Sequence, residues 1–290
     1  MKKNRLWIGI FLAPALILFL AVFGASLVIL VSTSFTEWSI GKPMVFTGID
    51  NYVKLITSDK AFRQAFVNTL IWILLQSTVH VAIGVLVALI LSRKRFYWKF
   101  VRTVYMIPNI ISSAALGMMF LILFNAQFGA VNKFIQALGF TDFSKNWFYE
   151  SNSSFWTVTI IWLPYAATIT ILVLAEIAAI DTSLFEAARV DGANELQVNL
   201  YITLPMLRSI IGTSAILGGT SMLQKLDVLM MTTQGGPLNR TLNLPLYIYQ
   251  TALTDNNFSL ANTAGVYLIL IGLVTVLVLN KAFRLGHSDL

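Results

Sequence analysis

The chain has 290 residues, of which 57% are hydrophobic and 11% are charged, whereas about a quarter of the residues in ordinary soluble domains are charged. A soluble fold of this composition would expose large apolar patches, so the composition favours a membrane protein. The absence of cysteine excludes disulfides, thiolate metal sites and a cysteine nucleophile.

Six long apolar stretches predict six membrane-spanning helices, since about 20 mostly apolar residues are needed to cross a bilayer. In chain order the predicted spans are 7–32, 65–92, 103–126, 155–180, 209–232 and 261–283. The first stretch is too long for a signal peptide and lacks a small-residue cleavage site, so we expect a retained helix. We therefore predict an all-α integral membrane protein in which residues 1–290 form a single transmembrane domain.

The distribution of Lys and Arg predicts which side of the membrane each loop occupies. Six spans place both termini on one side, and that side carries twelve basic residues: Lys2, Lys3, Arg5, Arg93, Lys94, Arg95, Lys99, Arg102, Arg189, Arg208, Lys281 and Arg284. The other side carries seven, which six acidic residues nearly balance, so we expect both termini in the cytoplasm. The basic and aromatic cluster at 93–102 is interpreted as an interfacial membrane anchor rather than a nucleic-acid site.

The loop 181–208, between the fourth and fifth spans, predicts two short helices joined at a glycine. Ser183 and Glu186 have the S-x-x-E spacing of a capping box, in which each side chain satisfies a backbone N–H of the first turn. Gly192 suits the left-handed conformation that ends such a helix. By this pattern alone, Glu186 is a helix cap.

The second helix of this loop has its own signals. Asn194 and Gln197 can cap its first turn. An apolar stripe follows at helical spacing, formed by Leu196, Leu200 and Leu204. Pro205 is expected to change the direction of the chain.

The string Glu186-Ala187-Ala188, followed by Gly192 and by Ile-Thr-Leu-Pro at 202–205, closely resembles the EAA motif of permease subunits in ATP-binding-cassette (ABC) importers. The resemblance implies the helical bundle of a type I importer permease in a bacterial plasma (inner) membrane. It also implies that the loop 181–208 is a coupling element that docks in a cleft of a separate ATPase subunit. The residues to which it assigns this role are Glu186, Ala187, Ala188 and Gly192.

Two further segment pairs resemble the first permease subunit of maltose-type, binding-protein-dependent carbohydrate importers. They are 35–39 with 46–52, and 226–237, which ends in Gln-Gly-Gly-Pro, with 247–249. The resemblance implies half of a translocation pore, completed by a second, non-identical permease. The other implied partners are two ATPase subunits, an extracellular solute-binding protein and the carbohydrate substrate.

No phosphate-binding loop of the G-x-x-x-x-G-K-[ST] type occurs in the sequence. We therefore expect a transport subunit that is not itself an enzyme and binds no cofactor, with ATP and Mg²⁺ used by the partner ATPases. A stand-alone secondary transporter is an alternative, but it would usually show an inverted repeat. A membrane-embedded transferase, the less favoured alternative, would call for clustered acids or histidines at a membrane face.

Polar residues inside the fifth span indicate a solute path, because charges within a membrane usually face a partner or a water-filled cavity. We expect Gln224 and Lys225 to edge the path while Asp227 braces a neighbouring helix, since residues two apart point to nearly opposite sides of a helix. A structural role for both charges is an equal alternative. Aromatic and hydroxyl or amide groups suited to sugars add four candidates: Trp162, Tyr165, Ser221 and Asn68.

Overall fold

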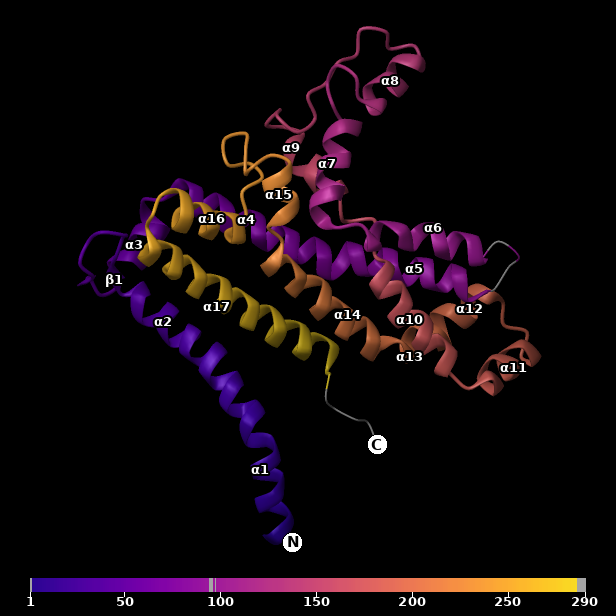
Figure 1. Cartoon of the computed structure of the whole chain (residues 1–290). Coiled ribbons are helices and arrows are strands. Elements are labelled where there is room, and N and C mark those ends of the chain that lie inside the picture. The colour runs from indigo at the N-terminus through magenta and orange to yellow at the C-terminus, as the bar shows by residue number, and fades with distance from the viewer. Residues whose placement is uncertain (1, 94–95, 97, 286–290) are drawn as a thin grey trace. The chain divides into compact units, whose positions relative to one another are not determined.

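The computed structural model describes the backbone of residues 2–93, 96 and 98–285, and the side chains of residues 11–93, 96 and 98–285. Five of the residues used to predict the cytoplasmic side therefore have side chains outside the described part: Lys2, Lys3, Arg5, Lys94 and Arg95. The chain divides into two compact units, one of Met1–Arg63 with Tyr247–Leu270 and one of Gln64–Leu246 with Ile271–Leu290. Figure 1 shows that the elements within both units are almost all helices.

The first unit contains a long apolar helix at its start. This helix is built from α1 (Lys2–Phe19), a π-helical turn (Leu20–Gly24) and α2 (Ala25–Ser34). Its part Phe11–Ser34 is long and apolar enough to cross a membrane. Large side chains such as Phe11, Leu18 and Val28 are exposed along it. A helix that is apolar on all sides suits a lipid environment.

Two short strands follow α2, and hydrogen bonds from α3 (Asp50–Thr57) and α17 (Phe258–Phe283) fix the end of α2. The strands β1 (Thr36–Glu37) and β2 (Val45–Phe46) pair antiparallel, and α3 comes next in the chain. Asn51 Nδ2 donates to the carbonyl oxygens of Ser34 (3.0 Å) and Thr36 (2.7 Å), and Thr263 Oγ1 also donates to Ser34 (3.1 Å). These bonds satisfy carbonyls that a helix end leaves without intrahelical partners.

Later in the chain, α16 (Leu244–Tyr249) and a π-helical turn (Gln250–Thr254) precede α17 (Phe258–Phe283), which is also long and apolar enough to cross a membrane. A third such helix of 33 residues runs over Lys60–Ser92. It consists of α4 (Lys60–Leu75), a π-helical turn (Gln76–His80) and α5 (Val81–Ser92).

The remaining helices of the second unit are shorter. Three consecutive pairs qualify as spans only if a bend is allowed: α6 (Trp98–Ile110) with α7 (Ser113–Leu123), bent by 102°; α10 (Ala167–Ala179) with α11 (Thr182–Val190), bent by 72°; and Glu195–Met206 with Arg208–Gln224, bent by 68°. In the described part of the chain this gives three spans, or six if each bent pair counts as one.

The last of these pairs is itself composed of short pieces: α12 (Glu195–Val198), a π-helical turn (Asn199–Thr203), α13 (Leu204–Met206), α14 (Arg208–Ser221) and a 3-10 turn (Met222–Gln224). Pro205 lies in α13, and the bend comes two residues later, at Leu207. The predicted change of direction near Pro205 is therefore confirmed. The other short helices are α8 (Ala130–Ala137), α9 (Ser154–Ile160) and α15 (Asp227–Met231).

The core of the second unit lies where α5, α10 and α14 meet. Its buried members are Val81, Val85, Ala88, Leu89, Ala166, Ile169, Val173, Leu207 and Ala215. The approach of α5 to α10 depends on Gly84, because a Cβ atom there would come within 2.7 Å of the Ile169 side chain. Thr170 Oγ1 donates to the Gly84 carbonyl at 3.1 Å across the same contact. Small residues allow this close helix packing in membranes.

The third, fourth and fifth predicted spans are interrupted rather than continuous helices. The third breaks at residues 111–112, where Ser112 caps a new helix by accepting from Ala115 N at 3.3 Å. The fourth breaks at residues 161–166, around Pro164. The fifth breaks at Lys225, whose backbone is extended with ψ 96°. Because of this last break, the ideal-helix geometry expected for Lys225 and Asp227 does not apply.

Candidate functional site

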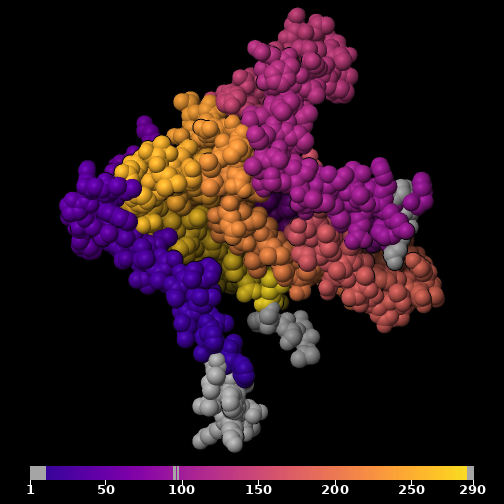
Figure 2. All heavy atoms as spheres, in the orientation of Figure 1, coloured from indigo at the N-terminus to yellow at the C-terminus, as the bar shows by residue number. Residues whose placement is uncertain are grey.

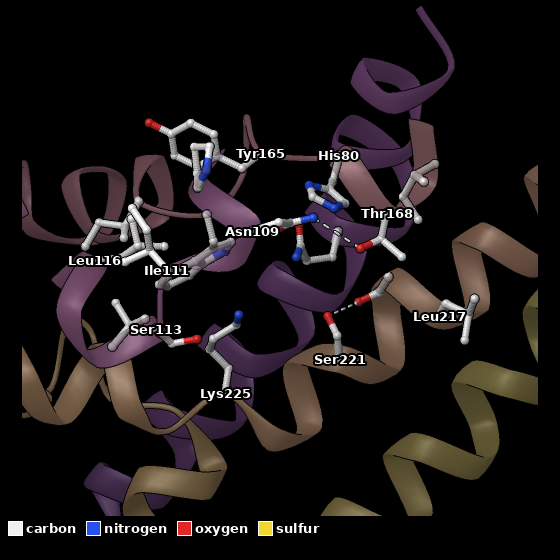
Figure 3. A pocket seen from close by; sticks show the side chains of 17 residues that line it. His80, Asn109, Ile111, Ser113, Leu116, Tyr165, Thr168, Leu217, Ser221 and Lys225 are labelled. Atoms are coloured by element: carbon white, nitrogen blue, oxygen red, sulfur yellow. Dashed lines mark hydrogen bonds between the residues drawn. The ribbon is translucent and has the colours of Figure 1, made fainter. Parts of the chain in front are cut away.

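The helix breaks of the second unit converge on one cavity of about 300 Å³. Its wall includes polar side chains from the π-helical turn (Gln76 and His80), from the helix ends that flank the α6–α7 break (Asn109 and Ser113), from the α9–α10 break (Tyr165) and from the start of α10 (Thr168). The labelled side chains in Figure 3 come from these segments and from α14, with Lys225 beyond its end. Irregular backbone at membrane depth is tolerated where it is buried in protein or lines a cavity.

Polar side chains satisfy the backbone groups that the α9–α10 break frees. Tyr105 OH donates to the Pro164 carbonyl at 2.9 Å and accepts from Ala166 N at 3.0 Å. His80 Nδ1 donates to the Leu163 carbonyl at 2.8 Å. These bonds fix the non-helical segment that places Tyr165 in the cavity wall. They also give His80 a hydrogen-bonding role in packing.

Lys225 contributes an ammonium group to the cavity. Its backbone carbonyl accepts from Asn243 Nδ2 at 2.6 Å, which fixes the chain at the break. Its Nζ lies 5.7 Å from the centroid of the Trp162 ring, within the range of a cation–π interaction. Among the described residues that line the cavity, none is Asp or Glu.

Two buried polar atoms of lining residues find no hydrogen-bond partner within the described part of the chain: Gln76 Oε1 and Trp162 Nε1. The residues are 4% and 6% exposed. Leaving a buried donor or acceptor without a partner costs about 1–3 kcal/mol, and native proteins rarely do so.

Four of the six residues predicted for the solute path line this cavity: Trp162, Tyr165, Ser221 and Lys225. Gln224 is exposed and lies outside the lining. Asn68 also lies outside the lining. Its Nδ2 instead donates to the carbonyls of Leu242 (2.7 Å) and Arg240 (3.1 Å), so its hydrogen bonds hold the backbone of residues 239–242.

Sequence reasoning missed several polar lining residues: Gln76, Asn109, Ser113 and Thr168. All four stand in predicted spans, so the argument applied to Lys225, that polar residues within a membrane face a partner or a cavity, could have found them. Among the described residues, no three His, Asp or Glu side chains come together to hold a metal ion.

The helix α11 begins differently from the prediction. Its N-cap is Asp181, whose carboxylate accepts from Ser183 N at 2.9 Å. Hydrogen bonds from the backbone and the hydroxyl of Ser183 hold the pKa of Asp181 below its usual value. The Ser183–Glu186 capping box is therefore wrong, since Asp181 is also a good cap and starts the helix two residues earlier. Glu186 lies beyond the first turn and is exposed.

The glycine reversal after α11 is confirmed. Gly192 has φ +79°. Ala193 N donates to the Ala188 carbonyl at 2.9 Å, and Gly192 N donates to the Arg189 carbonyl at 3.1 Å. This is the Schellman pattern that ends helices at a left-handed glycine. Within α11, Ala187 is exposed, whereas Ala188 is only 8% exposed.

The capping of α12 is also confirmed. Asn194 Oδ1 accepts from Gln197 N at 2.9 Å, and Gln197 Oε1 accepts from Asn194 N at 2.8 Å. An ion pair of 2.8 Å joins Glu195 to Arg93 at the end of α5. Both partners are largely exposed, so the pair is screened and contributes little stability. Its geometric effect is to tie α12 to the end of a span.

Several apolar side chains on this loop are exposed. They are Leu184, Val190, Leu196, Leu200 and Tyr201, of which Val190 is the most exposed at 88%. Figure 2 shows the loop helices at the surface of the second unit, in salmon. Exposed apolar patches with a polar rim are typical of protein interaction sites.

Comparison with known proteins places these features in a family. The family model described as "Binding-protein-dependent transport system inner membrane component" matches residues 80–285. The multiple sugar-binding transport system permease protein MsmF of Streptococcus mutans is 30% identical, over 97% of both chains. The probable ABC transporter permease protein YurN of Bacillus subtilis is 27% identical, over 99% of both chains.

A solved structure shares the fold. One chain of a bacterial ABC transporter that imports the acidic polysaccharide alginate superposes with a TM-score of 0.82, covering 98% of this chain and 96% of that one. The sequence identity is 24%. The predicted fold class, an all-α importer permease bundle, is confirmed.

Proposed function

The chain belongs to the family of binding-protein-dependent transport system inner membrane components, and on that premise we propose that it is one of two permease subunits of an ATP-driven carbohydrate importer. It forms half of the translocation pore. A second, non-identical permease forms the other half, and an extracellular solute-binding protein delivers the carbohydrate. Relatives such as MsmF, whose name refers to sugar binding, support this substrate class.

The observation that carries the proposal is the cavity at the converging helix breaks. It combines the side chain of Trp162 with the hydroxyls of Tyr165 and Ser221 and with the amide of Asn109. Saccharides need an aromatic surface for their apolar faces and polar groups for their hydroxyls, a mixture found in small-molecule sites. A volume of about 300 Å³ is at the lower end of the range for such sites.

The loop 181–208 is the proposed coupling element within a single permease domain of residues 1–290. One of the two separate ATPase subunits, which use ATP and Mg²⁺, binds it through Glu186, Ala187, Ala188 and Gly192. The exposed apolar side chains around α11 and α12 support a docking role. Through the Arg93–Glu195 ion pair, a movement of the loop would be passed directly to α5.

The proposed location is a bacterial plasma membrane with both termini and the coupling loop in the cytoplasm. The excess of Lys and Arg in the corresponding segments supports this orientation. It places the coupling loop on the side where ATP is available.

Purification from native membranes tests this function. We expect a tagged chain to bring down two ATPase subunits and a second permease. Proteoliposomes containing that complex should take up saccharide only when both ATP and the solute-binding protein are supplied. Proteoliposomes with the chain alone are the control. Uptake by the chain alone, driven by an ion gradient, would contradict the proposal and indicate a secondary carrier.

A further inference from the structure

Lys225 supplies the one fixed charge among the described residues that line the cavity. The other polar lining groups are amides, hydroxyls, the indole of Trp162 and the imidazole of His80. A neutral saccharide requires no ammonium for recognition, and a charge within a membrane segment is costly. The presence of Lys225 therefore calls for a partner of opposite charge.

The protein does not provide that partner at close range. Within the described ranges, Lys225 forms no ion pair shorter than 4.0 Å. Asp227, two residues later, attracts the Lys225 ammonium electrostatically, but its exposed side chain is beyond ion-pair distance and does not line the cavity. The Trp162 ring lies 5.7 Å from Nζ. A ring face does not use all three N–H donors of an ammonium group.

The neighbouring polar side chains indicate what else the partner carries. The hydroxyls of Tyr165 and Ser221 and the amide of Asn109 line the same cavity. Hydroxyl and amide groups can each donate and accept hydrogen bonds, as sugar hydroxyls do. A ligand that suits these groups together with Lys225 therefore combines several hydroxyls with a negative charge.

We propose that the cavity takes an anionic saccharide with a single negative charge, such as a uronate, and that Lys225 selects it. This inference rests on the proposed carbohydrate transport and specifies its substrate class. One ammonium balances one carboxylate. A phosphate ester carries a charge of about −1.5 to −2 at neutral pH, which would leave excess negative charge in a site of low dielectric.

The test uses the complete importer with its solute-binding protein in proteoliposomes. Three radiolabelled probes are compared: digalacturonate, the neutral disaccharide galactobiose, and galactose 1-phosphate. Lys225→Met removes the charge and keeps the side-chain length, whereas Lys225→Arg keeps the charge. Lys133→Met makes the same chemical change on α8, where Lys133 is exposed. ATPase activity without saccharide verifies that each variant complex is assembled.

We expect the importer to carry digalacturonate, and Lys225→Met to reduce that uptake by about tenfold or more, since hydrogen bonds to charged groups are strong. Lys225→Arg should keep most of the activity, and Lys133→Met all of it. Transport of galactobiose or galactose 1-phosphate but not digalacturonate, or digalacturonate uptake that is unchanged in Lys225→Met, would overturn the inference while leaving carbohydrate transport intact. Failure to carry any of the three probes or any other saccharide would instead overturn the proposed function.

Discussion

Asn68 and Lys225 are both polar residues in apolar stretches, yet their surroundings differ. Asn68 is 2% exposed, and its amide holds the backbone carbonyls of Arg240 and Leu242. Lys225 faces a cavity in which the described lining residues offer no acid. The residue type alone suggested that both line a solute path. It does not reveal which backbone carbonyls a polar side chain can reach in the folded chain.

At this scale we predict that Asn68→Ala lowers the stability of the importer complex and leaves its KM for saccharide uptake unchanged. Removing the amide leaves buried carbonyls without a donor, which costs about 1–3 kcal/mol. Thermal unfolding of the purified complex measures the loss.

Asn109→Ala is the matched control, since Asn109 lines the cavity and donates to Thr168 Oγ1 at 3.2 Å. It should raise KM by about two- to tenfold, as expected for one lost neutral hydrogen bond, with little change in stability. An Asn68→Ala variant with a raised KM and normal stability would show that Asn68 belongs to the path after all.

Among the elements, the helices whose ends carry local signals were predictable. Asn194 with Gln197 and the left-handed Gly192 act through neighbours within five residues, so their spacing was sufficient. The cap of α11 was misassigned because Asp181 and Ser183 are both good caps within one turn. Helix ends with a single candidate capping residue were therefore predicted better than the helix end with two such candidates.

The breaks that create the cavity could not be predicted in the same way. A broken span and a continuous one have the same apolar composition, and what tolerates the break lies far away in the sequence. The break at Pro164 is satisfied by Tyr105 and His80, which are 59 and 83 residues distant from the carbonyls they bind. Tertiary partners of this kind are not visible in a single sequence.

For the packing of elements, we predict that Gly84→Ala destabilises the complex by about 1–3 kcal/mol, a typical cost of overpacking. The new methyl group would approach Ile169 to 2.7 Å and separate α5 from α10. Gly24→Ala is the control, because a Cβ there meets its nearest atom at an ordinary 3.8 Å. Equal thermal stability of the two variants would argue against a tight α5–α10 contact.

For the whole molecule, the sequence predicted the class of fold better than its internal division. Composition and six apolar stretches indicated a membrane bundle, and the shared fold of the alginate importer chain agrees with it. The separation into two compact units had no signal in composition, since both contain long apolar helices. The assembly follows from family membership: an inner membrane component of a binding-protein-dependent system works with other chains.

In the proposed importer, a separate ATPase holds the loop 181–208 on the cytoplasmic side. Because the chain has no cysteine, a single thiol can test this at Ala187 in α11, with Ala137 in α8, between the third and fourth predicted spans, as an equally exposed control. We predict that Ala187→Cys reacts with an impermeant maleimide only in inside-out vesicles and crosslinks to the ATPase subunit, whereas Ala137→Cys reacts only from outside intact cells and forms no such crosslink. Labelling of Ala187→Cys from outside intact cells, or no crosslink to an ATPase in the purified complex, would contradict this arrangement.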